Sequence, residues 1–195
     1  MRAQEGRAVE ALRLGMGLRH PGYNVFVVRD DTRQADLLFQ QSVTTYQAYN
    51  YWGGKSLYKW GSTERKRAAK VSFNRPYAAN AQNLATAYGM GAGEFLTNLQ
   101  PHNDGYKVSN AGWEYNMVRW LEREGYDVAY CTNMDVHATP GLLPRHKAWL
   151  SVGHDEYWSW PMRDHVEAAR DAGVHLGFFG ANAAYWQVRF EASPA

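Results

Sequence analysis

Three consecutive ionisable residues, His154, Asp155 and Glu156, stand between apolar stretches of the sequence. The run 148–150 before them is typical of a short buried strand, and the serine and proline within 159–161 are typical of the first turn of a helix. Charged groups are costly to bury without partners, so a triplet at such a junction is a candidate binding or catalytic site. The alternative interpretation is that these residues are solvated loop charges or carboxylates that cap the following helix.

The elements that must position this triplet alternate between strand and helix patterns from about residue 113 onward. Apolar residues at helical spacing predict one helix that begins near residue 113 and ends at Gly125, and another over 160–172. Together with strands near residues 36, 127, 148 and 174, this alternation predicts an α/β fold. We expect a mostly parallel open sheet with flanking helices, in three layers as in flavodoxin-like or glutamine-amidotransferase-like proteins.

Loops that follow parallel strands lie at one edge of the sheet, which predicts where the polar segments of this chain meet. The polar or aromatic loops expected at that edge are 46–51, 132–135, 154–156 and 182–186. Four such loops at one edge are stronger evidence for a site than any of them alone.

The rest of the chain has weaker patterns. Residues 1–23 resemble the poorly defined tail of a preceding region, and 24–195 form the main domain. We expect strands over 24–28 and 71–73 and a short helix over 93–99. The stretch from about 58 to 108 is otherwise a long irregular insertion rich in aromatic residues, which favours an ordered, functional segment.

Composition excludes several classes of function. The formal net charge of +2 gives no reason to expect a nucleic acid or an anionic membrane as partner. The chain has no run of about 18 apolar residues and no apolar signal core near its start, so we predict no membrane span. Cys131 is the single cysteine, which excludes an internal disulfide and fits a reducing, cytoplasmic location.

Two kinds of nucleophilic catalysis find little support. The sequence has no Gly-x-Ser-x-Gly elbow of a serine hydrolase, and Ser151 falls within the predicted strand. Cys131 ends a predicted strand, where a nucleophile is possible, but a lone cysteine there is more often a packing residue.

A metal site is the stronger hypothesis from the residue types. His154 and Glu156 are two positions apart, yet the other histidines offer no evident second nitrogen ligand. Oxygen ligands remain, namely Glu156 and the tyrosines of the aromatic loop. A phenol with its usual pKa of about 10 ionises at neutral pH only when a strong Lewis acid takes its proton, which favours a hard trivalent ion such as Fe(III).

Five blocks of the sequence stand out. They are YQAYNYWGGKSLY at 46–58, VSFNRPY at 71–77, WEYNMVRWL at 113–121, GHDEYWS at 153–159 and GANAAYWQVR at 180–189. In this order the blocks resemble the C-terminal domain family of the large (beta) subunit of N,N-dimethylformamidase. The resemblance extends over about residues 24–191.

This resemblance implies an iron-dependent amidohydrolase that cleaves the C–N bond of a small N-substituted amide of the formamide type. The family's characterised site is a mononuclear iron, held by two tyrosines and a glutamate, with a histidine and an asparagine nearby. Matched motif by motif, Glu156 is the ligand glutamate, and His154 and Asn182 are the expected catalytic residues. Tyr77 and Tyr49 are the expected ligand tyrosines, and Tyr46 and Tyr51 remain alternatives to Tyr49.

The family also uses an acidic residue well downstream, beyond Ala195. We therefore expect 24–195 to be a domain truncated at its C-terminal end, inactive and poorly stable alone, that works with other subunits or the rest of a longer chain. Whether this chain is itself an enzyme is left open. The alternative hypothesis is a non-catalytic binding or assembly module that keeps the fold without turnover.

Overall fold

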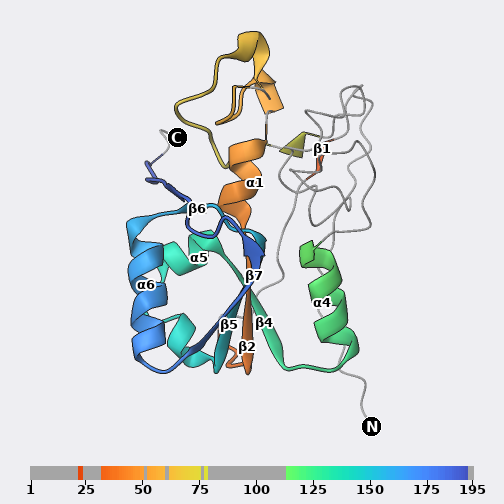
Figure 1. The fold of residues 1–195 in the computed structure, drawn as a ribbon, viewed down its shortest axis with the longest axis vertical. Coiled ribbons are helices and arrows are strands. Elements are labelled where there is room, and N and C mark those ends of the chain that lie inside the picture. The colour runs from red at the N-terminus through yellow and green to blue at the C-terminus, as the bar shows by residue number, and fades with distance from the viewer. Residues whose placement is uncertain are drawn as a thin grey trace.

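The computed structural model describes residues 22–23, 32–50, 52–59, 62–75, 77–78 and 113–192. Its centre is an open four-stranded sheet in the order β4-β2-β5-β7, in which every pairing is parallel (Figure 1). The strands are β2 (Leu37–Gln41), β4 (Val128–Thr132), β5 (Ala148–His154) and β7 (His175–Ala181). The four strands and the α/β class predicted from the sequence are therefore confirmed.

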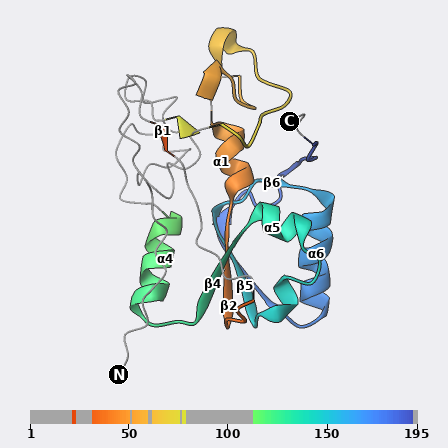
Figure 2. The ribbon, with the colours of Figure 1, turned by 180° about the vertical axis from the view of Figure 1, so that it is seen from behind.

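Helices cover both faces of the sheet, which gives three layers (Figures 1 and 2). On one face α5 (Asn133–Ala138) and α6 (Trp160–Asp171) enclose an apolar cluster that includes Leu38, Trp149 and Met162. Cys131 is buried in the same cluster, as expected of a packing cysteine. On the other face α4 (Trp113–Arg123) packs over a second cluster built around Phe39 and Leu121.

The two long helices begin and end where the sequence predicts. Ser159 caps α6, since its hydroxyl accepts a hydrogen bond from the backbone N–H of Met162 at 3.3 Å, and Pro161 lies in the first turn, where its missing N–H costs nothing. After α4 the chain turns at Gly125, whose φ of 77° is accessible to glycine without strain. Both helix predictions are confirmed.

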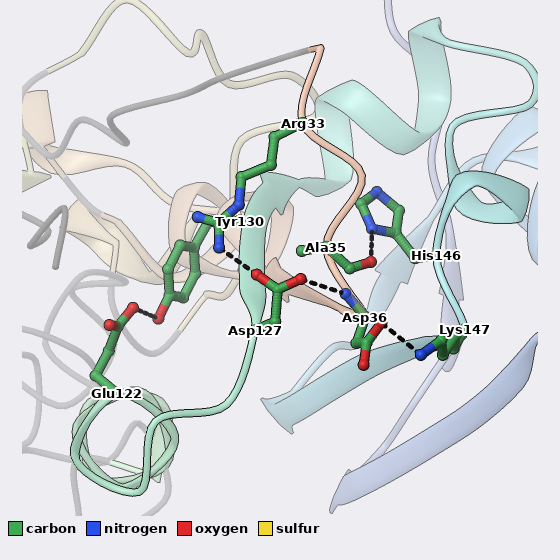
Figure 3. Close-up of polar contacts among 8 residues, drawn as sticks. All are labelled: Arg33, Ala35, Asp36, Glu122, Asp127, Tyr130, His146 and Lys147. Atoms are coloured by element: carbon green, nitrogen blue, oxygen red, sulfur yellow. Dashed lines mark hydrogen bonds and ion pairs between the residues drawn. The ribbon is translucent and has the colours of Figure 1, made fainter. Parts of the chain in front are cut away.

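The strand starts of the sheet are joined by exposed ion pairs (Figure 3). Arg33, just before β2, pairs with Asp127, just before β4, and Asp127 also accepts the backbone N–H of Asp36 at 3.2 Å. Lys147, just before β5, pairs with Asp36 at 2.7 Å. These contacts hold the first residues of three neighbouring strands in register.

The loop predicted over 46–51 is wrong in its first part, because Val43–Tyr49 form helix α1. Its threonines and tyrosines have modest helix propensity, and Ser42 gives no side-chain cap. Burial of nearly the whole helix overrides that propensity, since six of its seven residues are buried. The α5 helix was also not predicted; Thr132 caps it through a reciprocal bond pair with Asp135.

The remaining elements are short. They are β1 (Gly22–Tyr23), β3 (Tyr77–Ala78), β6 (Tyr157–Trp158), β8 (Trp186–Gln187), η1 (Trp52–Gly54), η2 (Thr63–Arg65) and η3 (Leu143–Arg145). The strand predicted over 71–73 is wrong: these residues make no ladder, and Phe73 is exposed and begins a bend. The strand predicted over 24–28 and the helix over 93–99 lie outside the described residues.

Candidate functional site

The four loops that follow the sheet strands converge at the C-terminal edge of the sheet. The backbone N–H of Thr44 in α1 donates to Asn133 Oδ1 at 3.2 Å, which joins the loops after β2 and β4. The hydroxyl of Thr45 accepts the backbone N–H of Glu156 at 3.0 Å, and the N–H of Ala184 donates to the carbonyl of Asp155 at 2.9 Å. The predicted convergence is confirmed.

The strand order places this edge at a topological switch point. β2, the first of the four strands in sequence, lies between β4 and β5, so the chain leaves β2 toward one side and later returns on the other. In open parallel sheets, ligands bind beyond the carboxyl ends of strands at such a point. The loops after β2 and β5, which carry α1 and the 154–156 triplet, lie at that position.

Asp155 is the most enclosed of the ionisable triplet, with no exposed surface. Its carboxylate accepts Gln40 Nε2 at 2.7 Å, Asn133 Nδ2 at 2.8 Å and Ser151 Oγ at 2.9 Å. Burial raises the pKa of this carboxyl, and the hydrogen bonds from Asn133 and Ser151 oppose the rise. The solvated-loop interpretation is therefore wrong for Asp155, which ties the ends of β2, β4 and β5 together.

The side chain of Glu156 lies among a group of tyrosines rather than with the partners of Asp155. Tyr49 Oη donates to Glu156 Oε1 at 2.8 Å, and Tyr58 Oη donates to Glu156 Oε2 at 3.0 Å. Tyr157 Oη in turn donates to Tyr58 Oη at 2.5 Å. Glu156 is only 2% exposed, and the tyrosines pack with Ala48 in a small apolar cluster above the sheet edge. The carboxylate of Glu156 thus accepts hydrogen bonds from two phenols at a position largely shielded from solvent.

These phenols are hard to ionise without a cation. Burial raises the pKa of Tyr49 and Tyr157 well above the usual range, and the nearby carboxylate of Glu156 adds to the rise. Burial also raises the pKa of Tyr58 to about 12, although its hydrogen bonds with Tyr157 and Tyr49 oppose the change. At neutral pH the three side chains are therefore protonated and serve as hydrogen-bond donors.

His154, the last residue of β5, is 6% exposed and lies between two carboxylates. Burial lowers the pKa of its imidazole, while the charges of Glu156 and Glu114 act in the opposite direction. Glu114 enters from the first turn of α4, is fully buried, and accepts the hydroxyl of Tyr46 at 2.8 Å. Gly153 makes this approach possible: its φ is +79°, and a Cβ there would lie 3.1 Å from the carboxyl carbon of Glu114.

The structure brings together part of the set predicted from the sequence. Tyr49 and Glu156 are in direct contact, and His154 is two residues from Glu156 on the same strand end. Asn182 follows β7 with a φ of 57° and an exposed side chain. The backbone of Tyr77 pairs in β3, but its side chain lies outside the described residues, so its role stays a prediction.

Tyr46 and Tyr51 are the two alternatives to Tyr49 as the ligand tyrosine. The Tyr46 hydroxyl is bonded to Glu114 rather than to Glu156, whereas Tyr51 lies outside the described residues. Of the two tyrosines that the structure describes at this position, Tyr49 donates a hydrogen bond to Glu156 and Tyr46 donates one to Glu114.

Sequence reasoning missed three residues of this site. Tyr58 and Tyr157 both stand in motif blocks, but nothing in their spacing indicates that they meet, because they are 99 positions apart. Glu114 reads as an ordinary acidic residue in the first turn of a helix. Met117 and Leu121 follow Glu114 at helical spacing and pack toward the sheet, and this spacing is the signal that could have found it.

The donor set is suited to a hard cation. Among the described residues there is no cluster of three histidine, cysteine, aspartate or glutamate side chains that could hold a metal. Phenol and carboxylate oxygens are present instead, with the Tyr49 hydroxyl 2.8 Å from one Glu156 oxygen. Such oxygens bind hard, highly charged ions, so Tyr49 and Glu156 fit the Fe(III) expected from the sequence.

The fold and the site define a class: an open parallel α/β domain with a buried carboxylate–phenol group at its switch point. The chain belongs to the family described as N,N-dimethylformamidase beta subunit-like, C-terminal, whose model matches residues 11–195. It is also 28% identical over 96 residues to the N,N-dimethylformamidase beta subunit of Alcaligenes sp. That match covers 48% of this chain and 13% of the relative, so the chain spans only a small part of the relative's length. None of the described helices is long and apolar enough to cross a membrane.

Proposed function

We propose that this chain carries the metal site of an iron-dependent amidohydrolase that cleaves the C–N bond of small N-substituted amides of the formamide type. Family membership supports the relation to dimethylformamidases. The observation that carries the proposal is the contact of Tyr49 and Tyr58 with the two oxygens of the buried Glu156. Burying Glu156 costs solvation that the two phenol hydrogen bonds restore only in part, and a bound cation would restore more of it.

Tyr49, Tyr77 and Glu156 are the proposed ligands of one Fe(III) ion. The bound ion would supply a Lewis acid able to polarise an amide carbonyl. The phenols at this position are protonated in the structure as it stands, and the raised pKa of Tyr49 means that only a strong Lewis acid displaces its proton at neutral pH. The high pKa therefore favours a trivalent ion over a softer divalent one.

His154 is the proposed proton carrier. Its lowered pKa keeps the imidazole neutral at pH 7, in the state that accepts a proton. Asn182 is the proposed residue that orients the substrate or its developing oxyanion. The hydrogen bonds from the N–H groups of Ala184 and Trp186 to the carbonyls of Asp155 and Glu156 support this proposal, because they join the loop after β7 to the site.

Further subunits are the proposed partners, together with a small amide as substrate. The relative is named as a beta subunit. Among the described residues β7 is an edge strand of the sheet, and its Phe178 and Phe179 are about half exposed, at 49% and 55%, which supports association. The same exposed edge is what favours the second candidate function, an assembly module without turnover.

Metal analysis separates the two candidates. We expect the chain, supplied with Fe(III), to take up one equivalent and to show the visible charge-transfer absorption of tyrosinate bound to iron. The preparation is then assayed on a panel of formamides, with and without the companion subunits. A folded protein that stays colourless and free of iron would exclude the iron hydrolase and leave the assembly module.

A further inference from the structure

We propose that Tyr58 is a positioning residue that occupies one oxygen of Glu156, so that this carboxylate offers only its other oxygen to a bound cation. The proposal rests on the proposed function, because it concerns how Glu156 would meet the metal. Tyr58 was not among the residues expected at the site from the sequence.

The two oxygens of Glu156 are held by different phenols. Tyr49, from helix α1, reaches Oε1 at 2.8 Å, whereas Tyr58, from the segment after η1, reaches Oε2 at 3.0 Å. The two rings stack with centroids 4.4 Å apart, so each hydroxyl is confined to its own side of the carboxylate. The carboxylate plane is therefore fixed at both ends.

The Tyr58 hydroxyl has a defined direction. Tyr157 donates to it, and its own hydrogen then points to Glu156 Oε2. The rings of Tyr58 and Tyr157 meet edge to face at 90°, with centroids 6.4 Å apart. A hydroxyl that accepts one hydrogen bond and donates another is polarised by the first, which strengthens its bond to the carboxylate.

Tyr58 is also anchored independently of Glu156. Its backbone N–H donates to Ser56 Oγ at 3.1 Å, and its carbonyl accepts Ser62 Oγ at 2.7 Å. The segment is joined to α1 as well, through the N–H of Leu57 and the carbonyl of Ala48 at 3.0 Å. These hydrogen bonds fix the loop that holds the Tyr58 phenol against Oε2 of Glu156.

The consequence is a limit on how Glu156 can bind a cation. Carboxylates bind metal ions through one oxygen or through both. With Oε2 held by a neutral phenol, Glu156 contributes through Oε1, on the side of Tyr49. A carboxylate restricted in this way leaves one more coordination position for a substrate oxygen than a carboxylate that binds through both.

The first arm of the test uses the metal-free chain. The infrared carboxyl band of Glu156 is identified as the band that disappears in Glu156→Gln. Tyr58→Phe keeps the ring and removes the hydroxyl, so we expect this band to shift. Tyr130→Phe is the matched control: it removes a hydrogen bond from a tyrosine to a different glutamate, Glu122, at 2.6 Å (Figure 3).

Tyr157→Phe is a second variant, in which a smaller effect is expected. It keeps the test decisive if circular dichroism shows that Tyr58→Phe does not fold. Removing the Tyr157 hydroxyl should shift the Glu156 band in the same direction, by less than Tyr58→Phe does. A Glu156 band that moves no more in Tyr58→Phe and Tyr157→Phe than in Tyr130→Phe overturns the proposal, whatever metal the protein binds.

The second arm uses the iron-loaded chain and azide as a probe of open positions. In Tyr58→Phe we expect unchanged iron stoichiometry and unchanged tyrosinate charge-transfer intensity, with azide bound several-fold more weakly because Glu156 can now use both oxygens. Loss of iron or of charge-transfer intensity in Tyr58→Phe would make Tyr58 itself a ligand and overturn the positioning role. If the unsubstituted chain takes up no Fe(III), the proposed function fails, and the infrared arm alone decides the Tyr58 proposal.

Discussion

The two ends of the central sheet handle carboxylates in opposite ways. At the strand starts, Asp36 and Asp127 are paired with Lys147 and Arg33 in solvent, with side chains between 41% and 75% exposed (Figure 3). At the strand ends, Asp155, Glu156 and Glu114 are buried. The hydrogen bonds described for them come from neutral side-chain amides and hydroxyls, most of which lie on the strands and helices around the sheet edge.

The two sets of carboxylates differ in what they cost the folded state. Exposed ion pairs contribute little to stability, so they tolerate change. Buried carboxylates held by neutral donors cost solvation, and folds seldom keep several of them at one edge unless chemistry requires them there. This comparison supports the proposal of a site at the C-terminal edge on grounds independent of any relative.

The largest effect on stability is expected from Asp155. Asp155→Ala removes the acceptor of three buried donors, on Gln40, Asn133 and Ser151, and leaves them unsatisfied. We expect the free energy of unfolding to fall by about 3–5 kcal/mol, since each orphaned buried donor costs about 1–3 kcal/mol and the costs overlap. Urea unfolding followed by circular dichroism measures the change. A loss as small as that of the exposed control Asp36→Ala would contradict the conclusion that Asp155 ties the ends of β2, β4 and β5 together.

A smaller loss is expected from Gly153→Ala. The φ of +79° strains any residue with a Cβ, and the added methyl group would lie 3.1 Å from the Glu114 carboxyl carbon. The conformational strain alone costs about 1–2 kcal/mol. Gly173→Ala is the matched control, because its φ is +91° but nothing lies within 4 Å of a Cβ there. Equal losses in the two variants would show that Glu114 does not crowd Gly153.

The smallest loss of stability is expected from a substitution at the strand starts. Arg33 holds the pKa of Asp127 below its usual range, so the ionised form is favoured in the folded state. This stabilisation is present above the unfolded pKa of about 3.9 and is lost as pH falls through the lower folded pKa. We expect Asp127→Asn to cost less than about 1 kcal/mol at pH 7, because the pair is exposed. The difference from the unsubstituted chain should shrink below pH about 4, and a difference that grows in acid would contradict this assignment.

The sequence predicted the strands and long helices of the fold better than the contacts within the candidate site. Runs of β-prone residues located β2, β4, β5 and β7, and Gly125 marked the end of α4, because these signals are local. Helix α1 was missed because its stability comes from burial rather than from its threonines and tyrosines. Convergence of the loops followed from the parallel order.

Particular contacts at the site could not be predicted in this way. Tyr58 and Glu156 are 98 positions apart, and nothing in either segment specifies which tyrosine of the aromatic stretch reaches the carboxylate. Glu114 lies on a helix that the sequence places correctly, but its contact with Tyr46 depends on how α4 packs on the sheet. Long-range pairings of this kind depend on tertiary packing, which local patterns do not encode.

The most direct test of the central claim compares iron binding in Glu156→Ala and Asp36→Ala, one acidic residue from each end of the sheet. We predict that Asp36→Ala binds one Fe(III) with the charge-transfer absorption of the unsubstituted chain, whereas Glu156→Ala, still folded by circular dichroism, binds none. Metal analysis of dialysed protein gives the stoichiometry, and visible absorption gives the tyrosinate signal. A full complement of iron in folded Glu156→Ala would contradict the assignment of the C-terminal edge as the metal site.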